Sequence, residues 1–162
     1  MLSDVIFINF IDMTFDEKEM VLSWRNNKNI KQWMYSSSDI SLENHLAFIE
    51  KLKSSTDKEY FLLKQNNSYV GVIDFTNIDK KNGSCEFGLY GNIELKGTGK
   101  ILLNSICEYA FERLNIKKLI AEVFIKNEKA INLYKRFDFQ ETTKKIVNNK
   151  EVIRMELKNE NR

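Results

Sequence analysis

The chain has 162 residues, 43% of them hydrophobic and 30% charged, a composition typical of one globular domain and not of a disordered segment. Its 25 basic and 23 acidic residues leave a formal net charge of +2, so charge gives no case for nucleic acid or a membrane as the main partner. We therefore expect residues 1–162 to form a single domain.

The cysteines and the N-terminal segment indicate a cellular compartment. Cys85 and Cys107 each lie in an apolar segment and form no CxxC motif, which predicts buried thiols and neither a disulfide nor a metal site. The N-terminal segment lacks a signal peptide's basic region and cleavage site, and no apolar run approaches the roughly 20 residues of a membrane helix. These features predict a cytoplasmic protein without a metal. The oligomeric state, including a homodimer, stays open.

The first third of the chain is predicted to be mostly helical. Thr14 and Glu17 have the spacing of a capping box, which opens a helix, and Ser41 can cap a later one. The elements expected here are a strand over 4–11, a helix from Thr14 to about Asn27, a short helical piece near 29–34 and a helix over 41–53.

The remainder alternates strands with two helices. Asn66-Asn67 and Asn148-Asn149 supply tight turns between apolar runs. The expected strands are 59–65, 68–77, 84–90, 118–124, 139–147 and 151–157, and the expected helices are 100–114 and 127–136. This order predicts an α/β fold with a mixed sheet of about seven strands and helices on both faces, and excludes a doubly wound sheet.

A glycine loop, Leu95-Lys96-Gly97-Thr98-Gly99-Lys100, lies between a predicted strand and a predicted helix start. Unpaired amides and the helix dipole favour a diphosphate there, and glycines allow close approach. A Walker A loop fails at Glu94 and Ile101, and a dinucleotide-binding fingerprint fails at Leu102. Two alternatives stay open: the pyrophosphate loop of acetyl-CoA-binding acetyltransferases, or a turn with no ligand.

A second motif, Asn127-Glu-Lys-Ala-Ile-Asn-Leu-Tyr-Lys-Arg-Phe-Asp-Phe139, follows some thirty residues later. Asn127, Ala130 or Ile131, and Tyr134 share one helical stripe, on which the small Ala130 leaves room for a thin ligand. Together the two motifs resemble those of the GCN5-related N-acetyltransferases, the GNAT superfamily, and the strand order fits that family across nearly the whole chain.

The resemblance implies acetyl-CoA as co-substrate and a central, mostly antiparallel sheet. It implies that the strand edge at 86–90, which includes Leu89, pairs with the pantetheine, and that Asn127 binds its amide arm. The chain departs from the family at Lys96, Ile101 and Asp138, and Ile101 puts the closest amide contact in doubt. The pyrophosphate would be held by the backbone amides of Gly97, Thr98, Gly99, Lys100 and Ile101.

The chemistry of acetyl transfer assigns further roles. Tyr134, placed by the resemblance near the sulfur, is protonated at neutral pH and suits a general acid for the departing thiolate. A backbone amide within 87–90 is the expected oxyanion donor. The base stays open between His45, Glu86, Glu122 and solvent. Direct transfer in a ternary complex needs no cysteine nucleophile.

A finer resemblance, over about residues 20–157, indicates the acceptor substrate. It is carried by the stretches WRNNKNIKQWM, EYFLLKQNNSYVGVIDFTNI and SCEFGLYGNIELKGTGKILLN. These stretches resemble the nucleotide-sugar acetyltransferases of pseudaminic acid biosynthesis. This implies as acceptor the 4-amino group of a UDP-linked 4-amino-4,6-dideoxy-N-acetyl-altrosamine. Other functions left open are a protein N-terminal or ribosomal-protein acetyltransferase and a non-catalytic acyl-CoA sensor. The implied substrate residues are Arg25 at the diphosphate or uridine and Met34, His45 and Tyr90 near the sugar, with Asn26 as a further substrate-binding candidate.

Overall fold

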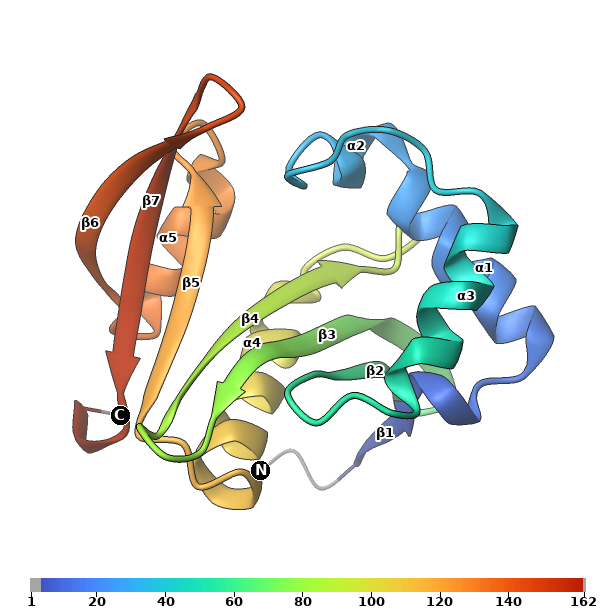
Figure 1. Ribbon diagram of the computed structural model, residues 1–162, viewed down its shortest axis with the longest axis horizontal. Coiled ribbons are helices and arrows are strands. Elements are labelled where there is room, and N and C mark those ends of the chain that lie inside the picture. Colours follow the sequence, from blue (N-terminus) through green and yellow to red (C-terminus); the bar gives the residue numbers. More distant parts are fainter. Residues whose placement is uncertain (1–3, 162) are drawn as a thin grey trace.

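A computed structural model describes residues 4–161 and contains one mixed sheet with strand order β1-β2-β3-β4-β5-β7-β6 (Figure 1). Neighbouring strands are antiparallel except β4 and β5, which are parallel. The predicted fold class and the count of about seven strands are confirmed. The strands are β1 (Val5–Asn9), β2 (Glu59–Gln65), β3 (Ser68–Asp79), β4 (Ser84–Gly91), β5 (Lys118–Phe124), β6 (Gln140–Val147) and β7 (Lys150–Lys158).

Helix ends follow the local signals in the sequence. The side chains of Thr14 and Glu17 each accept a hydrogen bond from the other's backbone N–H, which completes the capping box, and Ser41 accepts from the N–H of Asn44. No helix among residues 4–161 is long and apolar enough to span a bilayer. The helices are α1 (Phe15–Asn26), α2 (Lys28–Lys31), α3 (Leu42–Leu52), α4 (Gly99–Glu108) and α5 (Glu128–Arg136), with short helices at Phe10–Asp12, Tyr109–Arg113 and Asn159–Asn161.

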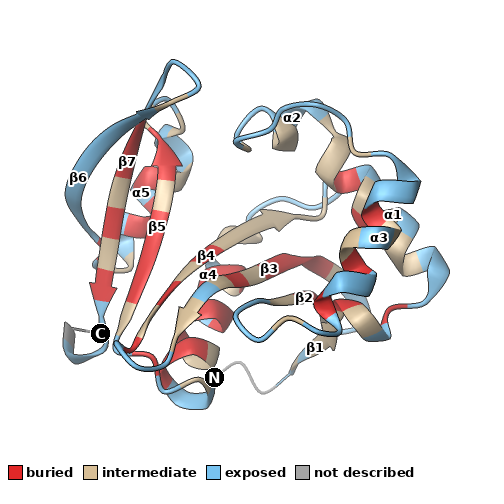
Figure 2. Ribbon diagram, in the orientation of Figure 1, coloured by how far each residue is buried: buried red, intermediate tan, exposed pale blue. Residues whose placement is uncertain are grey.

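The strands bury their two faces in two separate clusters. Side chains alternate across a strand, so Ile73 and Phe75 face one side and Val72 faces the other. The larger cluster includes residues of α4 and α5, and the smaller one includes residues of α1 and α3. Figure 2 shows the many buried residues of β5 and β7 next to the exposed edge strand β6. The helices therefore cover both faces of the sheet, as predicted.

The sheet opens between β4 and β5. These strands pair only where Ser84–Glu86 lies beside Lys118–Ile120. Beyond that point β4 stays paired with β3 up to Gly91, while β5 stays paired with β7 up to Phe124. The two strands diverge in Figure 1, which leaves one edge of β4 without a strand neighbour and creates a wedge at the centre of the molecule.

The bounds of several predicted elements differ from the structure, and two of these differences have a clear local cause. The first strand ends at Asn9 and not at 11, because the Asn9 side chain accepts from the N–H of Ile11 and caps the short helix Phe10–Asp12. The helix predicted over 100–114 changes at Tyr109 into one π-helical turn, closed by the N–H of Leu114 on the carbonyl of Tyr109. The Tyr109 ring there contacts the rings of Phe7, Phe61 and Phe75.

Candidate active site

Two adjoining cavities occupy the wedge. The inner cavity, of about 330 Å³, lies between α1, α3 and the strands, and the glycine-loop groove, of about 600 Å³, runs from it to the start of α4. Their shared walls mark the place where a ligand in one meets a ligand in the other. The residues that line both are Trp33, Met34, Leu89, Tyr90, Asn127 and Tyr134.

The glycine loop shapes the outer end of the groove. Gly97 has a φ of +72°, a backbone conformation that a residue with a Cβ rarely adopts. Thr98 precedes α4 without capping it through its side chain, so the first amides of the helix lack an internal partner. Gly97, Thr98 and Gly99 line the groove, whereas Lys100 and Ile101 do not. The partly buried Ile101 packs against the larger core cluster, which removes its side chain from the groove.

Asn127 begins α5 and faces both cavities. Its Oδ1 accepts a hydrogen bond from the N–H of Ala130 at 3.3 Å, so it caps the helix. The N–H groups of Nδ2 remain as donors toward a ligand. Leu89, on the unpaired edge of β4, lies across the wedge, where an extended ligand chain can meet both.

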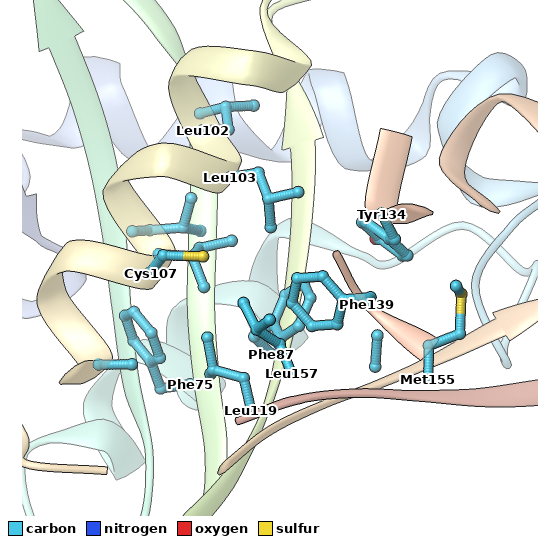
Figure 3. Packing of buried hydrophobic residues seen from close by; sticks show 14 of the residues in the cluster. Phe75, Phe87, Leu102, Leu103, Cys107, Leu119, Tyr134, Phe139, Met155 and Leu157 are labelled. Atoms are coloured by element: carbon cyan, nitrogen blue, oxygen red, sulfur yellow. The ribbon is translucent and has the colours of Figure 1, made fainter. Parts of the chain in front are cut away.

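Tyr134 combines a buried ring with a hydroxyl that reaches the site. Its ring packs against Phe87 and Phe139, with centroids 5.6 and 5.7 Å away (Figure 3). No residue among 4–161 forms a hydrogen bond with its hydroxyl, and the side chain lines both cavities. Burial, and then the charge of Asp74, raise the pKa of the phenol, so it carries its proton at neutral pH.

The three side chains expected as candidate bases, Glu122, Glu86 and His45, all form hydrogen bonds within the protein. Glu122 lines the inner cavity, but it accepts from the Tyr35 hydroxyl at 2.5 Å and pairs with Lys145 at 2.7 Å. Burial alone would raise its pKa, and these two partners lower it instead. Glu86 lies outside both cavities and accepts from the Asn77 amide at 2.6 Å.

His45 is a buried residue of α3 that lines the inner cavity. Its Nε2 lies 2.9 Å from the carbonyl oxygen of Lys18, so in the neutral ring Nε2 donates and Nδ1 remains an acceptor. Burial lowers its pKa. The ring is therefore neutral at pH 7.

The expected substrate residues separate into two groups. Arg25, Met34 and Tyr90 line the inner cavity, whereas the Asn26 side chain lines neither cavity and instead bonds both backbone groups of Ile40. Asn26 therefore holds the loop after α2. Arg25 donates through Nη2 to the carbonyl of Ser36 at 2.8 Å, while its buried Nη1 has no partner. A buried guanidinium nitrogen without an acceptor is costly, and a ligand oxygen would satisfy it.

Asp74 adds a carboxyl group to the lining of the inner cavity. It faces the cavity from the middle of β3, opposite Gly88 of β4. Burial, and further the charge of Glu86, raise its pKa to about 7. From the sequence, the strand faces around Asp74, Phe75 and Tyr90 are expected to border the acceptor, but no chemical role is predicted for Asp74. A signal was present, since an acidic residue interrupts an otherwise apolar strand centre, Val70-Gly-Val-Ile-Asp-Phe75.

Both cysteines are buried free thiols, as predicted. Among the described residues no group of three or more histidine, cysteine and acidic side chains is arranged to hold a metal ion.

Comparison with known proteins decides the family. Residues 8–140 match the family described as acetyltransferase (GNAT) domain. The chain belongs to the GNAT acetyltransferase family. The family predicted from the glycine loop and the Asn127 motif is thereby confirmed.

Individual relatives agree with this. The acetyltransferase PseH of Campylobacter jejuni is 46% identical over 131 residues, which cover 81% of this chain and 82% of that protein. The crystal structure of C. jejuni PseH in complex with acetyl coenzyme A superposes with a TM-score of 0.79 at 39% identity, covering 96% of this chain and 99% of the other. Spermidine N-acetyltransferase from Vibrio cholerae, in complex with CoA and spermine, shares the fold with a TM-score of 0.88 at 21% identity over 98% of both chains.

Proposed function

We propose that this GNAT protein transfers the acetyl group of acetyl-CoA to the 4-amino group of a UDP-linked 4-amino-4,6-dideoxy-N-acetyl-altrosamine, a step of pseudaminic acid biosynthesis. The similarity to PseH supports this acceptor. The observation that carries the proposal is the inner cavity, which is lined both by Arg25, whose buried Nη1 has no partner, and by the carboxyl group of Asp74. A ligand that satisfies both must carry an anionic or acceptor oxygen and an amine. A nucleotide amino sugar has both.

Acetyl-CoA fits the glycine-loop groove. The free amides at the start of α4 suit its pyrophosphate, and the edge of β4 at Leu89 and the Asn127 amide suit the pantetheine arm. The thioester would then lie at the shared walls of the two cavities, next to the Tyr134 hydroxyl. Tyr134 would then protonate the departing thiolate.

The acceptor fits the inner cavity. Arg25 would bind a phosphate or uridine oxygen through Nη1, and Nδ1 of His45 can accept from a sugar hydroxyl. Met34, Phe48 and Tyr60 supply an apolar wall that suits the 6-deoxy methyl group. The sugar amine would thus approach the thioester from the side of β3 and β4.

The test is thiol release from acetyl-CoA with four amines: a UDP-4-amino-6-deoxy sugar, the free amino sugar, a polyamine and an N-terminal peptide. We expect strong turnover with the nucleotide sugar alone. In the same assay Arg25→Ala should raise the KM for the nucleotide sugar about 10- to 100-fold, because a charge-assisted hydrogen bond is lost, and leave the KM for acetyl-CoA unchanged. Turnover with the peptide or the polyamine alone would exclude the sugar acceptor.

Other functions make different demands on the same cavities. A polyamine is a repeated cation, and the unpartnered guanidinium of Arg25 would repel it. A non-catalytic acyl-CoA sensor would bind acetyl-CoA without turnover of any amine. We further propose that the protein is cytoplasmic, acts as a single domain and forms a homodimer. Size-exclusion chromatography with light scattering tests the homodimer.

A further inference from the structure

The missing side chain of Gly88 leaves room for the carboxyl group of Asp74. In the register of β3 and β4, Asp74 lies opposite Gly88, and a Cβ at Gly88 would come within 2.7 Å of Asp74 Oδ2. The backbone N–H of Gly88 donates to the carboxylate. No Lys, Arg or His in the described part of the chain forms an ion pair with it. The missing counter-charge must come from solvent or from a ligand.

The surroundings of Asp74 suit a cation that arrives with the substrate. Burial, and then the charge of Asp74, raise the pKa of the phenols of Tyr60, Tyr90 and Tyr134, on β2, β4 and α5, so all three stay neutral. The negative Glu86 of β4 disfavours ionisation of Asp74 further. The other charged or titratable groups lining this cavity are Arg25 of α1, His45 of α3 and Glu122 of β5.

On the basis of the proposed function, we propose that Asp74 binds the ammonium group of the acceptor and accepts the proton that the amine loses before it attacks the thioester. Asp74 and Tyr134 line the same 330 Å³ cavity, and the charge of one acts on the other. Both groups therefore border the cavity in which the amine would meet the thioester.

The steps balance. R–NH3⁺ gives one proton to the Asp74 carboxylate and becomes R–NH2. The nitrogen lone pair forms a C–N bond to the thioester carbon, the C–S bond breaks, and the sulfur leaves with the proton of the Tyr134 hydroxyl. The second proton lost by the nitrogen restores Tyr134, and Asp74 releases its proton to solvent. The products are the amide, CoA–SH and one H⁺.

Asp74→Asn tests the role, because Asn keeps the shape and an acceptor oxygen for the Gly88 N–H but takes up no proton. We expect kcat/KM for the amine to fall about 10²- to 10⁴-fold, with unchanged Kd for acetyl-CoA. The wild-type pH profile of kcat/KM should inflect near pH 7. In D74N that inflection should be replaced by the titration of the acceptor's own amine. A lower rate with the inflection intact would mean a purely structural role and overturn the inference.

Glu122→Gln is the comparison variant, because Glu122 is the other carboxylate lining the inner cavity. The inflection near pH 7 should persist in E122Q. Its loss there, and not in D74N, would transfer the role to Glu122 and overturn the inference.

A wild-type protein that turns over none of the amines would refute the proposed function, and a second measurement then decides on Asp74 alone. In ¹³C NMR of the Asp carboxyls, the resonance missing from D74N should titrate near pH 7. A midpoint near 4, the ordinary value for Asp, would overturn the inference whatever the turnover.

Discussion

At the scale of single residues, Tyr134 serves the core and the site with different parts of one side chain. The ring is 7% exposed and packs on Phe87 and Phe139, so the fold fixes its direction. The hydroxyl has no partner among residues 4–161 and faces the cavities. Removing the hydroxyl therefore removes the proposed proton donor and leaves the packing.

Tyr134→Phe should lower kcat about 100-fold or more, because the thiolate must then leave without a positioned proton donor. The melting temperature and the Kd for acetyl-CoA should stay close to wild type, since no intramolecular hydrogen bond is lost. Steady-state kinetics, calorimetric titration and thermal denaturation measure the three. Tyr109→Phe is a matched control: its hydroxyl donates to Glu59 at 2.6 Å, away from both cavities, so Tm should fall and kcat should not. Wild-type kcat in Y134F would refute the general acid.

At the scale of elements, α5 begins inside the site. Asn127 is the last residue before the helix, and its Oδ1 caps the helix. The same side chain lines the groove, where Nδ2 can donate to a ligand. A helix start is a place where the sequence specifies local structure strongly, so the position of the amide is set by the fold before any ligand binds. Capping and binding can be separated by two substitutions.

Asn127→Asp keeps a capping oxygen but has no amide donor, and Asn127→Ala loses both. N127D should retain the wild-type Tm and raise the KM for acetyl-CoA about tenfold, the value of one lost hydrogen bond to a ligand. N127A should show the same KM effect and a stability loss of about 1 kcal/mol. Thermal denaturation and acetyl-CoA kinetics check this. Equal KM values for wild type and N127D would restrict Asn127 to capping.

Local sequence signals predicted the helix caps and tight turns well, but not the pairing and register of distant strands. The capping box at Thr14 and the paired asparagines at 66–67 and 148–149, all four at positive φ, are sequence-local, and the structure contains each of them. The pairing of β5 with β7 joins segments about thirty residues apart, and no local pattern in the sequence specifies it. The cavity role of Asp74 depends on the register of β3 with β4, which a single sequence does not display.

At the scale of the whole molecule, the sheet is two halves joined over a short parallel contact, with the site in the opening between them. The loop after α2 bridges the opening. Tyr35 donates to Glu122 of β5, and Asn148, in the β6–β7 turn, donates to the carbonyl of Tyr35. On its other side, Arg25 and Asn26 of α1 hold the loop at Ser36 and Ile40. Arg25 and Glu122, which line the inner cavity, therefore also hold this loop in place, so the ionisation of site residues affects the stability of the fold.

The pH dependence of stability should display that coupling. The folded-state pKa of Asp74 is about 7, above its ordinary 3.8, so the folded state binds more protons between these values and stability falls as pH rises from about 4 to 7. The His45 pKa is lowered, so His45 acts in the opposite direction and costs stability as pH falls below about 6.5. The lowered pKa of Glu122 gives stability at neutral pH that is lost as pH falls through its folded-state value.

Asp74→Asn removes only the first of these contributions. The Tm of D74N minus that of wild type should therefore increase from pH 4 to pH 7, by about 3 °C or more, and stay constant above. E122Q should show the opposite sign, with a Tm below wild type at pH 7 and a difference that shrinks toward pH 4. Thermal denaturation at unit steps from pH 4 to 8 measures both. If the Tm difference between D74N and wild type did not change with pH, Asp74 would ionise as freely in the folded protein as in the unfolded chain. A carboxylate so well solvated would not hold the acceptor's amine.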